Sequence, residues 1–440
     1  MMLNKAYKKY KSSEVEWLGD VPEHWEVKRL RYLTTINDET LPENTAPDYE
    51  LLYVDISSVD PSRGIVQKEP IVFENAPSRA RRIVRNGDTI VSTVRTYLRA
   101  ISPVTEPEEN LIVSTGFAVI RPNNINRNYL SASIRAPYFI ETVVSRSVGV
   151  SYPAINASEI GLISIPLPPI YEQHAIAAFL DRETGRIDTL IAKKKSLLSL
   201  LAEQRTALIS RAVTKGLNPS VKLKPSGVEW LGDVPEHWEV KKIRHMFTFR
   251  SGGTPSTENP DYWDGDIPWV SPKDMKSFYI VDTEDHINQI AIQESATNLI
   301  QKNTLVIVMR SGILIHSIPA CVLMRAMAIN QDIKAFLPTV QIFPAYYARF
   351  IECFQKQLLT EWRKEGATVE SLDMELIKNF HVPFFPLPEQ QAIADFLDRE
   401  TAKIDTLSLK IQTAIERLKE YRTALISAAV TGKIDVREAV

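Results

Sequence analysis

The stretch Val15-Glu-Trp-Leu-Gly-Asp-Val-Pro-Glu-His-Trp-Glu-Val-Lys28 recurs without a change at residues 228–241 of the same chain. A second stretch, residues 172–190, recurs at residues 389–407 with 15 of 19 positions identical. A third, residues 205–214, recurs at residues 422–431 with 9 of 10 positions identical. The blocks keep their order at offsets of 228 − 15 = 213 and 389 − 172 = 217 residues. The chain is therefore two copies of one plan.

The segments between the repeated blocks differ from each other. Residues 29–171 and 242–388 have similar lengths, 143 and 147 residues, but little identity. A solenoid is one reading of a repeat, but a period near 215 residues is the size of a domain and exceeds solenoid units. Because the repeated blocks are retained in both halves while the segments between them differ, the sequence favours a duplicated binding protein whose target has two different parts.

Length and composition limit the class of protein. A chain of 440 residues with 44% apolar and 24% charged residues is globular and long enough for two to four domains. Lys and Arg total 52 and Asp and Glu total 54, so the formal charge is −2. This balance excludes a protein that coats nucleic acid with its whole surface, but it leaves room for a local basic face.

Two further features concern location. Cys321 and Cys353 are too few for a disulfide framework, and they fit a reducing cytoplasm. No run of about 18 apolar residues exists, so we expect no membrane span. The sequence therefore predicts a cytoplasmic protein.

Short apolar runs predict a mixed α+β fold for each variable segment. Runs at residues 51–56, 89–93 and 117–120 are bounded by Asn, Gly, Pro and Asp, as strands often are. Residues 305–309 and 333–337 have the same character in the second half. Each half is thus expected to hold a globule of helices and strands.

The blocks that begin at Glu172 and Glu389 predict two long helices. Each runs for about 43 residues without proline, or roughly 60 Å at 1.5 Å per residue. Apolar residues recur every seven positions, interrupted at Lys194, which predicts an antiparallel coiled coil of the two helices. The predicted seam is Leu180, Ile187, Leu201, Leu208, Leu397, Ile404, Ile411, Leu418 and Leu425, with second-seam positions at Leu190, Leu197, Leu407, Ala414 and Tyr421. Two separate helices, each packed on its own domain, remain the alternative.

Motifs of catalysis are mostly missing. The sequence has no Gly-x-x-x-x-Gly-Lys-Ser/Thr loop for ATP, and no Gly-x-Gly-x-x-Gly after a strand. Glu26-Val-Lys28 and Glu239-Val-Lys241 match half of a nuclease metal site, but no Asp partner is evident. His24 and His237 are expected to belong to packed turns beside Trp25 and Trp238 rather than to bind a metal.

A local basic patch is the main binding signal. Residues 79–99 contain six arginines and one acid, Asp88, for a local charge of 6 − 1 = +5. Arginine binds phosphates through two hydrogen bonds and can read guanine edges, so the patch suits duplex DNA. A solvated or acid-paired face is the alternative. The candidate DNA-contacting residues here are Arg79, Arg81, Arg82, Arg95, Tyr97 and Arg99.

The second variable segment is less basic, and its candidates come from short polar loops. The loop Arg250-Ser-Gly-Gly-Thr-Pro255 offers small residues for close approach, and Asn and Gln side chains suit adenine edges. The candidates are Ser271, Lys273, Arg310, Asn330 and Gln331.

Together these motifs resemble the specificity (S) subunit of Type I restriction-modification systems. The resemblance rests on Trp-Leu-Gly-Asp-Val-Pro-Glu-His-Trp in each half, Ser-Gly-Gly-Thr-Pro at 251–255, Gly-Asp-Ile-Pro-Trp at 265–269 and a Pro-Leu-Pro turn before each long helix. It implies two mixed α/β target recognition domains, separated by two long helices conserved in that family, with pseudo-twofold repeat. The implied division is an N-terminal segment at 1–24 that completes a pseudo-circular frame, target recognition domains at 25–168 and 238–385, a central helix at 169–215, a linker with the repeated Trp-Leu-Gly-Asp segment at 216–237, a distal helix at 386–431 and a tail at 432–440.

The resemblance also implies function and partners. Such a subunit is not an enzyme; it reads an asymmetric, bipartite double-stranded DNA target and carries no cofactor. Two methyltransferase (M) subunits would hold S-adenosylmethionine, and two restriction (R) subunits would use ATP and Mg. Repeated arginines on the helices, placed off the predicted seam, are the candidates for binding the M subunits: Arg182, Arg205, Arg399 and Arg422. A non-catalytic coiled-coil scaffold without sequence reading is the alternative, and surface pairing within each helix is the other reading of the arginines.

Overall fold

The computed structural model describes residues 6–61, 63–366 and 369–437, so the ends of the predicted N-terminal segment and tail (residues 1–5 and 438–440) lie outside it. The chain divides into two compact units. Unit 1 is Met1–Lys195 with Gln412–Val440, and unit 2 is Ser196–Ile411. The division cuts both long helices, so each unit contains a globule together with half of each helix.

Unit 1 contains two four-stranded sheets. The first has the order β11-β10-β13-β4 (Ile101–Pro103, Thr89–Ser92, Phe117–Pro122, Thr34–Ile36). The second has the order β8-β5-β12-β9 (Glu69–Val72, Glu50–Val54, Leu111–Ser114, Ala80–Ile83), in which β5 and β12 are parallel. Short pairs join β1 (Tyr10–Ser12) to β2 (Asp20–Pro22), β3 (Glu26–Arg29) to β14 (Ser164–Leu167) and β6 (Val59–Asp60) to β7 (Gly64–Ile65), and the helices are α1 (Arg127–Ile134), α2 (Pro137–Ser145) and α3 (Ala157–Gly161).

Alternation along β13 explains how unit 1 forms its two larger cores. Phe117 and Val119 pack between the two sheets, whereas Ala118 and Ile120 pack against the helices. Because successive strand side chains point to opposite faces, a strand buried on both faces reads as a continuous apolar run. The predicted strands at residues 89–93 and 117–120 are confirmed as β10 and β13.

Unit 2 repeats this arrangement with one large core and one smaller cluster. One sheet has the order β18-β26-β23-β24-β20 (Phe247–Ser251, Ile333–Pro338, Leu305–Val308, Ala320–Leu323, Tyr279–Ile280), and the other β21-β19-β25-β22 (Asp285–Ile287, Ile267–Val270, Met327–Ile329, Leu299–Ile300). The parallel pair β19 and β25 corresponds to β5 and β12. Further elements are β15 (Leu223–Pro225) with β16 (Asp233–Pro235), β17 (Glu239–Lys242) with β27 (His381–Phe384), α5 (Gln289–Glu294), α6 (Pro344–Trp362) and α7 (Met374–Asn379).

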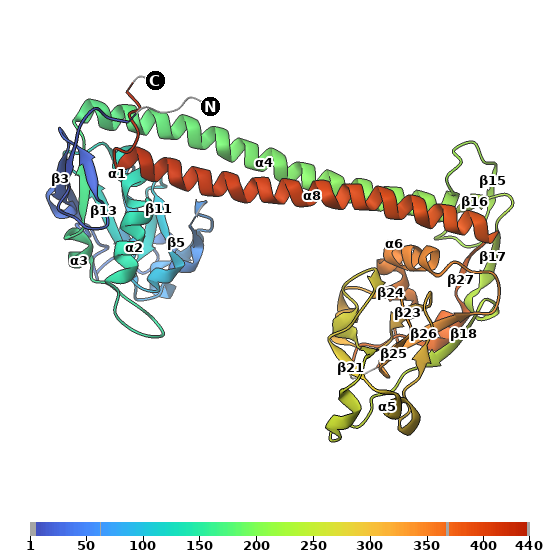
Figure 1. The fold of residues 1–440 in the computed structure, drawn as a ribbon. Helices are drawn as coiled ribbons and strands as arrows, with labels where there is room; N and C mark the ends of the chain where they lie inside the picture. The colour runs from blue at the N-terminus through green and yellow to red at the C-terminus, as the bar shows by residue number, and fades with distance from the viewer. Residues whose placement is uncertain (1–5, 62, 367–368, 438–440) are drawn as a thin grey trace. The chain divides into compact units, whose positions relative to one another are not determined.

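The two long helices are α4 (Ile170–Lys215) and α8 (Leu387–Val430). Each is followed by a glycine with positive φ, Gly216 at 69° and Gly432 at 71°, a conformation that commonly ends helices. In each unit the two helices run side by side in opposite directions (Figure 1). An ion pair joins Arg422 to Asp188 in unit 1, and its counterpart joins Arg205 to Asp405 in unit 2. The antiparallel coiled coil and the pseudo-twofold repeat of the predicted fold class are therefore confirmed.

The residues of the predicted first seam are buried or half-buried, whereas most residues of the predicted second seam lie one position before a less exposed one. Leu180, Ile187 and Leu201 are buried, as are Leu397, Ile411 and Leu425, and the other first-seam residues are half-buried. Leu190, Leu197, Leu407 and Tyr421 are instead exposed by 42% to 45%. Along each helix of a coiled coil, the residues that face the partner are spaced alternately four and three positions apart. Counted from the first seam, the second seam therefore falls at positions such as Ile191 and Ile415.

The repeated sequence blocks form the joint between globule and helix. The side chain of Glu172, at the start of α4, is fully buried and accepts hydrogen bonds from Trp25 Nε1 at 2.9 Å and Tyr7 Oη at 3.1 Å, while His24 Nε2 lies 2.6 Å away. In unit 2, Glu389 accepts from Trp238 Nε1 at 3.1 Å. The repeated His-Trp and Glu residues are therefore structural, as expected for His24 and His237.

The glutamine that follows each of these glutamates also connects the globule to the helix. Gln173 Oε1 accepts from the backbone N–H of Asn126 at 2.8 Å, and Gln390 Oε1 accepts from that of Phe343 at 2.9 Å. The two acceptors are 390 − 173 = 217 positions apart, and the two donors are also 343 − 126 = 217 positions apart. The identity of the repeated blocks thus reflects a repeated hydrogen-bond network, and an offset of 217 relates equivalent positions of this frame.

The C-terminal end of the described chain packs on its beginning within unit 1. Tyr10 Oη donates to the carbonyl of Gly432 at 3.0 Å, and Lys433 Nζ donates to that of Asp20 at 2.7 Å. A Cβ on Gly432 would lie 2.3 Å from Pro22 Cδ, so only glycine fits there. In unit 2 a Cβ on Gly216, after α4, would lie 3.5 Å from Trp238, as one on Gly432 would lie 3.2 Å from Trp25, so the two segments correspond.

Candidate nucleic-acid interface

In unit 1 a short 3₁₀ turn carries three of the candidate residues. It spans Thr96–Leu98, directly after β10, and is flanked by Arg95 and Arg99, whose φ angles of 50° and 53° are left-handed. Tyr97 is 54% exposed, and the side chain of Arg99 is 52% exposed, with its guanidinium 2.7 Å from Glu141. Two arginines and a tyrosine therefore project from one strained, solvent-facing turn, which we call the Tyr97 turn (residues 95–99).

A neighbouring loop extends this surface and was missed in the sequence. Residues 148–154 fold back on themselves, and Ala154 bridges to both Val148 and Val94. The guanidinium of Arg95 lies 4.9 Å from the ring centre of Tyr152, which is 65% exposed. Val148 and Val150 are 81% and 101% exposed. The sequence signal for this loop was the short apolar run Val148-Gly149-Val150, which lies outside the predicted strands and helices.

The other arginines of the basic patch are dispersed. Arg79 lies at the same edge, since its carbonyl accepts from Thr115 N and the adjacent Gly116 carbonyl accepts from Thr93 N. Arg81 instead covers the ring of Phe73 at 4.6 Å, and Arg82 is half-buried with an unpartnered Nε. Burial lowers the pKa of Arg82. The structure thus places the backbone of Arg79 near the start of the Tyr97 turn, with its guanidinium 3.4 Å from Asp55, whereas Arg81 and Arg82 make other contacts.

Unit 2 places a corresponding turn after the corresponding strand. A 3₁₀ turn at Gly312–Ile315 follows β23, as the Tyr97 turn follows β10. Arg310 precedes it, with Nε 2.9 Å from Asp332 Oδ1 and a side chain 58% exposed. Ile313 and Ile315 are 40% and 59% exposed. The same position in the frame therefore presents different chemistry in the two units: arginine and tyrosine in one, one arginine and two isoleucines in the other.

Two polar candidates lie beside this second turn. Asn330 is buried, and its Oδ1 accepts from the backbone N–H of Asp332 at 3.1 Å, so it shapes the turn. Gln331 is exposed and bonded to Thr254. The Gly-Gly loop packs closely here, because a Cβ on Gly252 would lie 1.7 Å from the carbonyl oxygen of Ile329. Gln331 and Arg310 are the candidates that this loop cluster exposes.

Ser271 and Lys273 have other partners in unit 2. Ser271 is buried and caps a 3₁₀ turn at Pro272–Asp274, with its Oγ donating to Asp274 at 2.7 Å. Lys273 lies 2.9 Å from Asp285 and 3.2 Å from Glu284, and these carboxylates raise its pKa through hydrogen bonds. Ser271 has no free hydroxyl donor for a base, whereas Lys273 is 45% exposed and could exchange partners.

The four helix arginines fall into two pairs of equivalents. Arg182 and Arg399 are exposed and lie over the rings of Phe179 and Phe396 at 5.6 and 5.7 Å. Arg205 and Arg422 are half-buried at second-seam positions and form ion pairs between the helices, so their expected place off the seam was wrong. The error follows from the one-residue shift of the second seam.

No catalytic or membrane feature emerges within the described ranges. Glu26 pairs with Lys28 and Glu239 with Lys241, so each Glu-x-Lys motif is internally neutralised. The described residues contain no group of three His, Cys, Asp or Glu side chains placed to hold a metal. None of the helices in those ranges is long and apolar enough to cross a membrane.

Curated relatives of this chain are specificity subunits. It is 35% identical over 185 residues to the Type I restriction enzyme EcoR124I/EcoR124II specificity subunit of Escherichia coli, covering 42% of this chain and 45% of that protein. It is 22% identical over 457 residues to the putative Type I restriction enzyme MjaX specificity subunit of Methanocaldococcus jannaschii, covering 99% and 100%. The first match thus spans less than half of the relative, whereas the second spans both chains at lower identity.

Solved structures share the fold. One, described as "Structural basis underlying complex assembly and conformational transition of the type I R-M system", superposes with a TM-score of 0.76 at 21% identity, covering 94% of this chain and 99% of the other. The HsdS subunit from Thermoanaerobacter tengcongensis gives 0.59 at 21% identity, covering 94% and 98%. The family described as "Type I restriction modification DNA specificity domain" matches twice, at residues 22–199 and 235–417. The chain belongs to this family of non-catalytic specificity subunits of Type I restriction-modification systems.

Proposed function

We propose that this chain reads an asymmetric, bipartite duplex DNA target, with one half-site for each unit. The observation that carries the proposal is the pair of equivalent turns, the Tyr97 turn and Gly312–Ile315, which follow equivalent strands but expose different side chains. Arginine suits phosphates and guanine edges, whereas isoleucine suits the thymine methyl group. Two unlike readers in one chain make the target unlike in its two halves.

The helix pair is proposed to hold two methyltransferase subunits. Arg182 and Leu190 are exposed on α4, and their equivalents Arg399 and Leu407 are exposed on α8. A surface that occurs twice by pseudo-twofold symmetry offers two equal binding sites. Restriction subunits would then join through the methyltransferases, and S-adenosylmethionine, ATP and Mg would belong to those partners.

Co-expression with a Type I methyltransferase subunit from the same host tests the proposal. Single-molecule methylation mapping of the host DNA should find modified bases within one sequence that has two specified parts and an unspecified gap. Modification of a single continuous sequence would contradict the bipartite reading. The absence of sequence-dependent modification and binding would favour a coiled-coil scaffold instead.

A further inference from the structure

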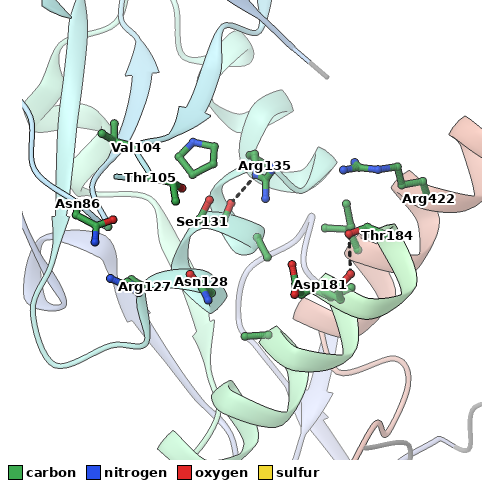
Figure 2. Close-up of a pocket in the computed structure, with 16 residues that line it drawn as sticks. Asn86, Val104, Thr105, Arg127, Asn128, Ser131, Arg135, Asp181, Thr184 and Arg422 are labelled. Carbon is green, nitrogen blue, oxygen red and sulfur yellow. Dashed lines mark hydrogen bonds between the residues drawn. The ribbon is translucent and has the colours of Figure 1, made fainter. Parts of the chain in front are cut away.

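A pocket in unit 1 contains more cationic than anionic groups. Its volume is about 330 Å³, and it lies between α1, α4 and α8. Arg135, directly after α1, and Arg422 of α8 both line it, and Figure 2 shows Arg422 reaching toward Arg135. No carboxylate of the described residues lies within 4.0 Å of Arg135, whose Nε donates only to the backbone carbonyl of Ser131 at 3.3 Å. Burial lowers the pKa of Arg135 and the charge of Arg422 lowers it further, while the carboxylate of Asp188 opposes both.

The pocket also contains an unused hydroxyl. Ser131 is 5% exposed, lines the pocket, and its Oγ has no hydrogen-bond partner among the described residues. A buried hydroxyl without a partner costs free energy, and a guanidinium without a counter-ion costs more. An anion bound beside Arg135 would provide the counter-ion that this guanidinium lacks, whereas Arg422 already pairs with Asp188.

Unit 2 provides an internal comparison. The offset of 217 that relates the hydrogen bonds of the frame makes Glu352 the equivalent of Arg135, and Arg205 the equivalent of Arg422 (352 − 135 and 422 − 205). Glu352 lies 2.8 Å from Arg205 and 2.7 Å from Arg349. Unit 2 therefore neutralises this position with its own side chains.

The same network fills the space that is open in unit 1. Arg349 continues to Asp398 at 2.7 Å, and Asp398 accepts from Tyr279. In unit 1 the equivalent of Arg349 is Ala132, which lines the pocket, and the equivalent of Asp398 is Asp181. Replacing a buried arginine by alanine opens the cavity, and replacing Glu352 by arginine reverses the charge of its wall.

The cationic surface continues from this pocket towards the Tyr97 turn. A larger adjoining pocket of about 740 Å³ shares Arg135 and Arg422 with the first, and it is also lined by Arg99 and Lys195. Within the described chain, neither Lys195 nor Arg127 of the first pocket has a carboxylate within 4.0 Å. The groove formed by these two pockets, the Arg135 groove, thus extends from the candidate DNA-contacting turn to a half-buried arginine pair.

We propose that the Arg135 groove binds a backbone phosphate of the duplex DNA, in unit 1 only, and this inference rests on the proposed function. An extended row of cations that begins at a DNA-contacting turn suits a polyanion better than a single carboxylate. Guanidinium groups bind phosphate oxygens through paired hydrogen bonds. The contact is independent of sequence, and it would make the unit 1 half of the target the more strongly held half.

Substitution of Arg135 separates this role from folding. Arg135→Glu should remove the phosphate contact while giving Arg422 the partner that Arg205 has in Glu352, so the melting temperature should stay equal or rise. Arg135→Ala removes the contact without creating an ion pair. Arg31→Glu changes the charge by the same amount in unit 1 at an exposed residue outside the groove, and it is the matched control.

The measurement is binding of a random-sequence DNA duplex to the full chain in complex with its co-expressed methyltransferase, over a series of salt concentrations. Since each phosphate contact contributes about 0.9 to the slope of log K against log salt, both Arg135 variants should lower the slope by about 1 and the low-salt affinity about fivefold or more. Arg31→Glu should lower neither by this amount. If both Arg135 variants kept the wild-type slope and affinity, the inference would be overturned while the proposed function would stand. Weaker methyltransferase binding with unchanged DNA binding would also overturn it, and would indicate that an acidic protein segment occupies the groove. A wild-type complex that binds no DNA would overturn the proposed function as well.

Discussion

Arg422 Nε on α8 lies 3.0 Å from Asp188 Oδ1 on α4, and its equivalent Arg205 Nε lies 3.2 Å from Asp405 Oδ1. The paired residue numbers sum to the same value, 188 + 422 = 205 + 405 = 610, as one antiparallel register requires. Only Arg205 has a second carboxylate partner, Glu352 at 2.8 Å. The symmetry of the frame therefore holds for the helices and breaks where the helices meet the globules.

That asymmetry predicts unequal costs for two equivalent substitutions. Arg422→Gln should lower the free energy of unfolding by about 0.5–1 kcal/mol, because it removes one partly exposed ion pair. Arg205→Gln should cost more, about 1–2 kcal/mol, because it also leaves the half-buried Glu352 with one fewer partner. Chemical denaturation of the two variants measures this order. Equal losses would show that the Glu352 contact contributes nothing.

A second matched pair concerns the joint between globule and helix. Glu172 is fully buried and accepts from Tyr7 and Trp25, whereas the side chain of Glu389 is 32% exposed. Glu172→Ala should cost about 3 kcal/mol or more by leaving buried donors unpaired, and Glu389→Ala about 1–2 kcal/mol. Thermal unfolding compares them. A larger loss at Glu389 would mean that burial does not set the cost.

The thiols of unit 2 predict a dependence on pH. Burial raises the pKa of Cys321 to about 12 and that of Cys353 to about 11, from an ordinary value of 9.0. Because the thiolate is the reactive form, its population at pH 8 should fall about 1000-fold and 100-fold. Alkylation of the native chain should therefore be slow at pH 8, faster at Cys353 than at Cys321, and should accelerate as pH rises. Labelling at the rate of the denatured chain would contradict the burial of both residues.

The Tyr97 turn predicts which arginines of the basic patch bind DNA. Arg95→Ala and Tyr97→Ala should each weaken binding of the complex to its target about tenfold, with the Arg95 variant also lowering the salt slope by about 1. Arg82→Ala, from the same run of sequence but half-buried on β9, should change binding far less. Titration of labelled duplex measures all three. If Arg82→Ala weakened DNA binding as much as Arg95→Ala, the interface would include β9 and the prediction would be wrong.

The sequence predicts the frame well and the interface poorly, for physical reasons. Long proline-free blocks with heptad spacing, and strands such as β13 buried on both faces, depend on local periodicity that the sequence displays. Leu190 and Ile191 are adjacent apolar residues, and only the folded helix pair shows which of them faces the partner helix. Leu190 was therefore misassigned. Arg81 and Arg82 lie away from the Tyr97 turn because of contacts that the sequence does not display, such as the packing of Arg81 over the ring of Phe73 and the burial of Arg82. The Arg135 groove was invisible because its residues come together only in the folded unit.

The central claim is that each unit reads its own half of the target, and one replacement tests it most directly. Residues 29–171 would be exchanged for the equivalent segment of another specificity subunit, with the helices and residues 172–440 retained. Methylation mapping after co-expression with the same methyltransferase should show a new sequence in one half of the target and the original sequence in the other. A change in both halves, or in neither, would contradict the claim.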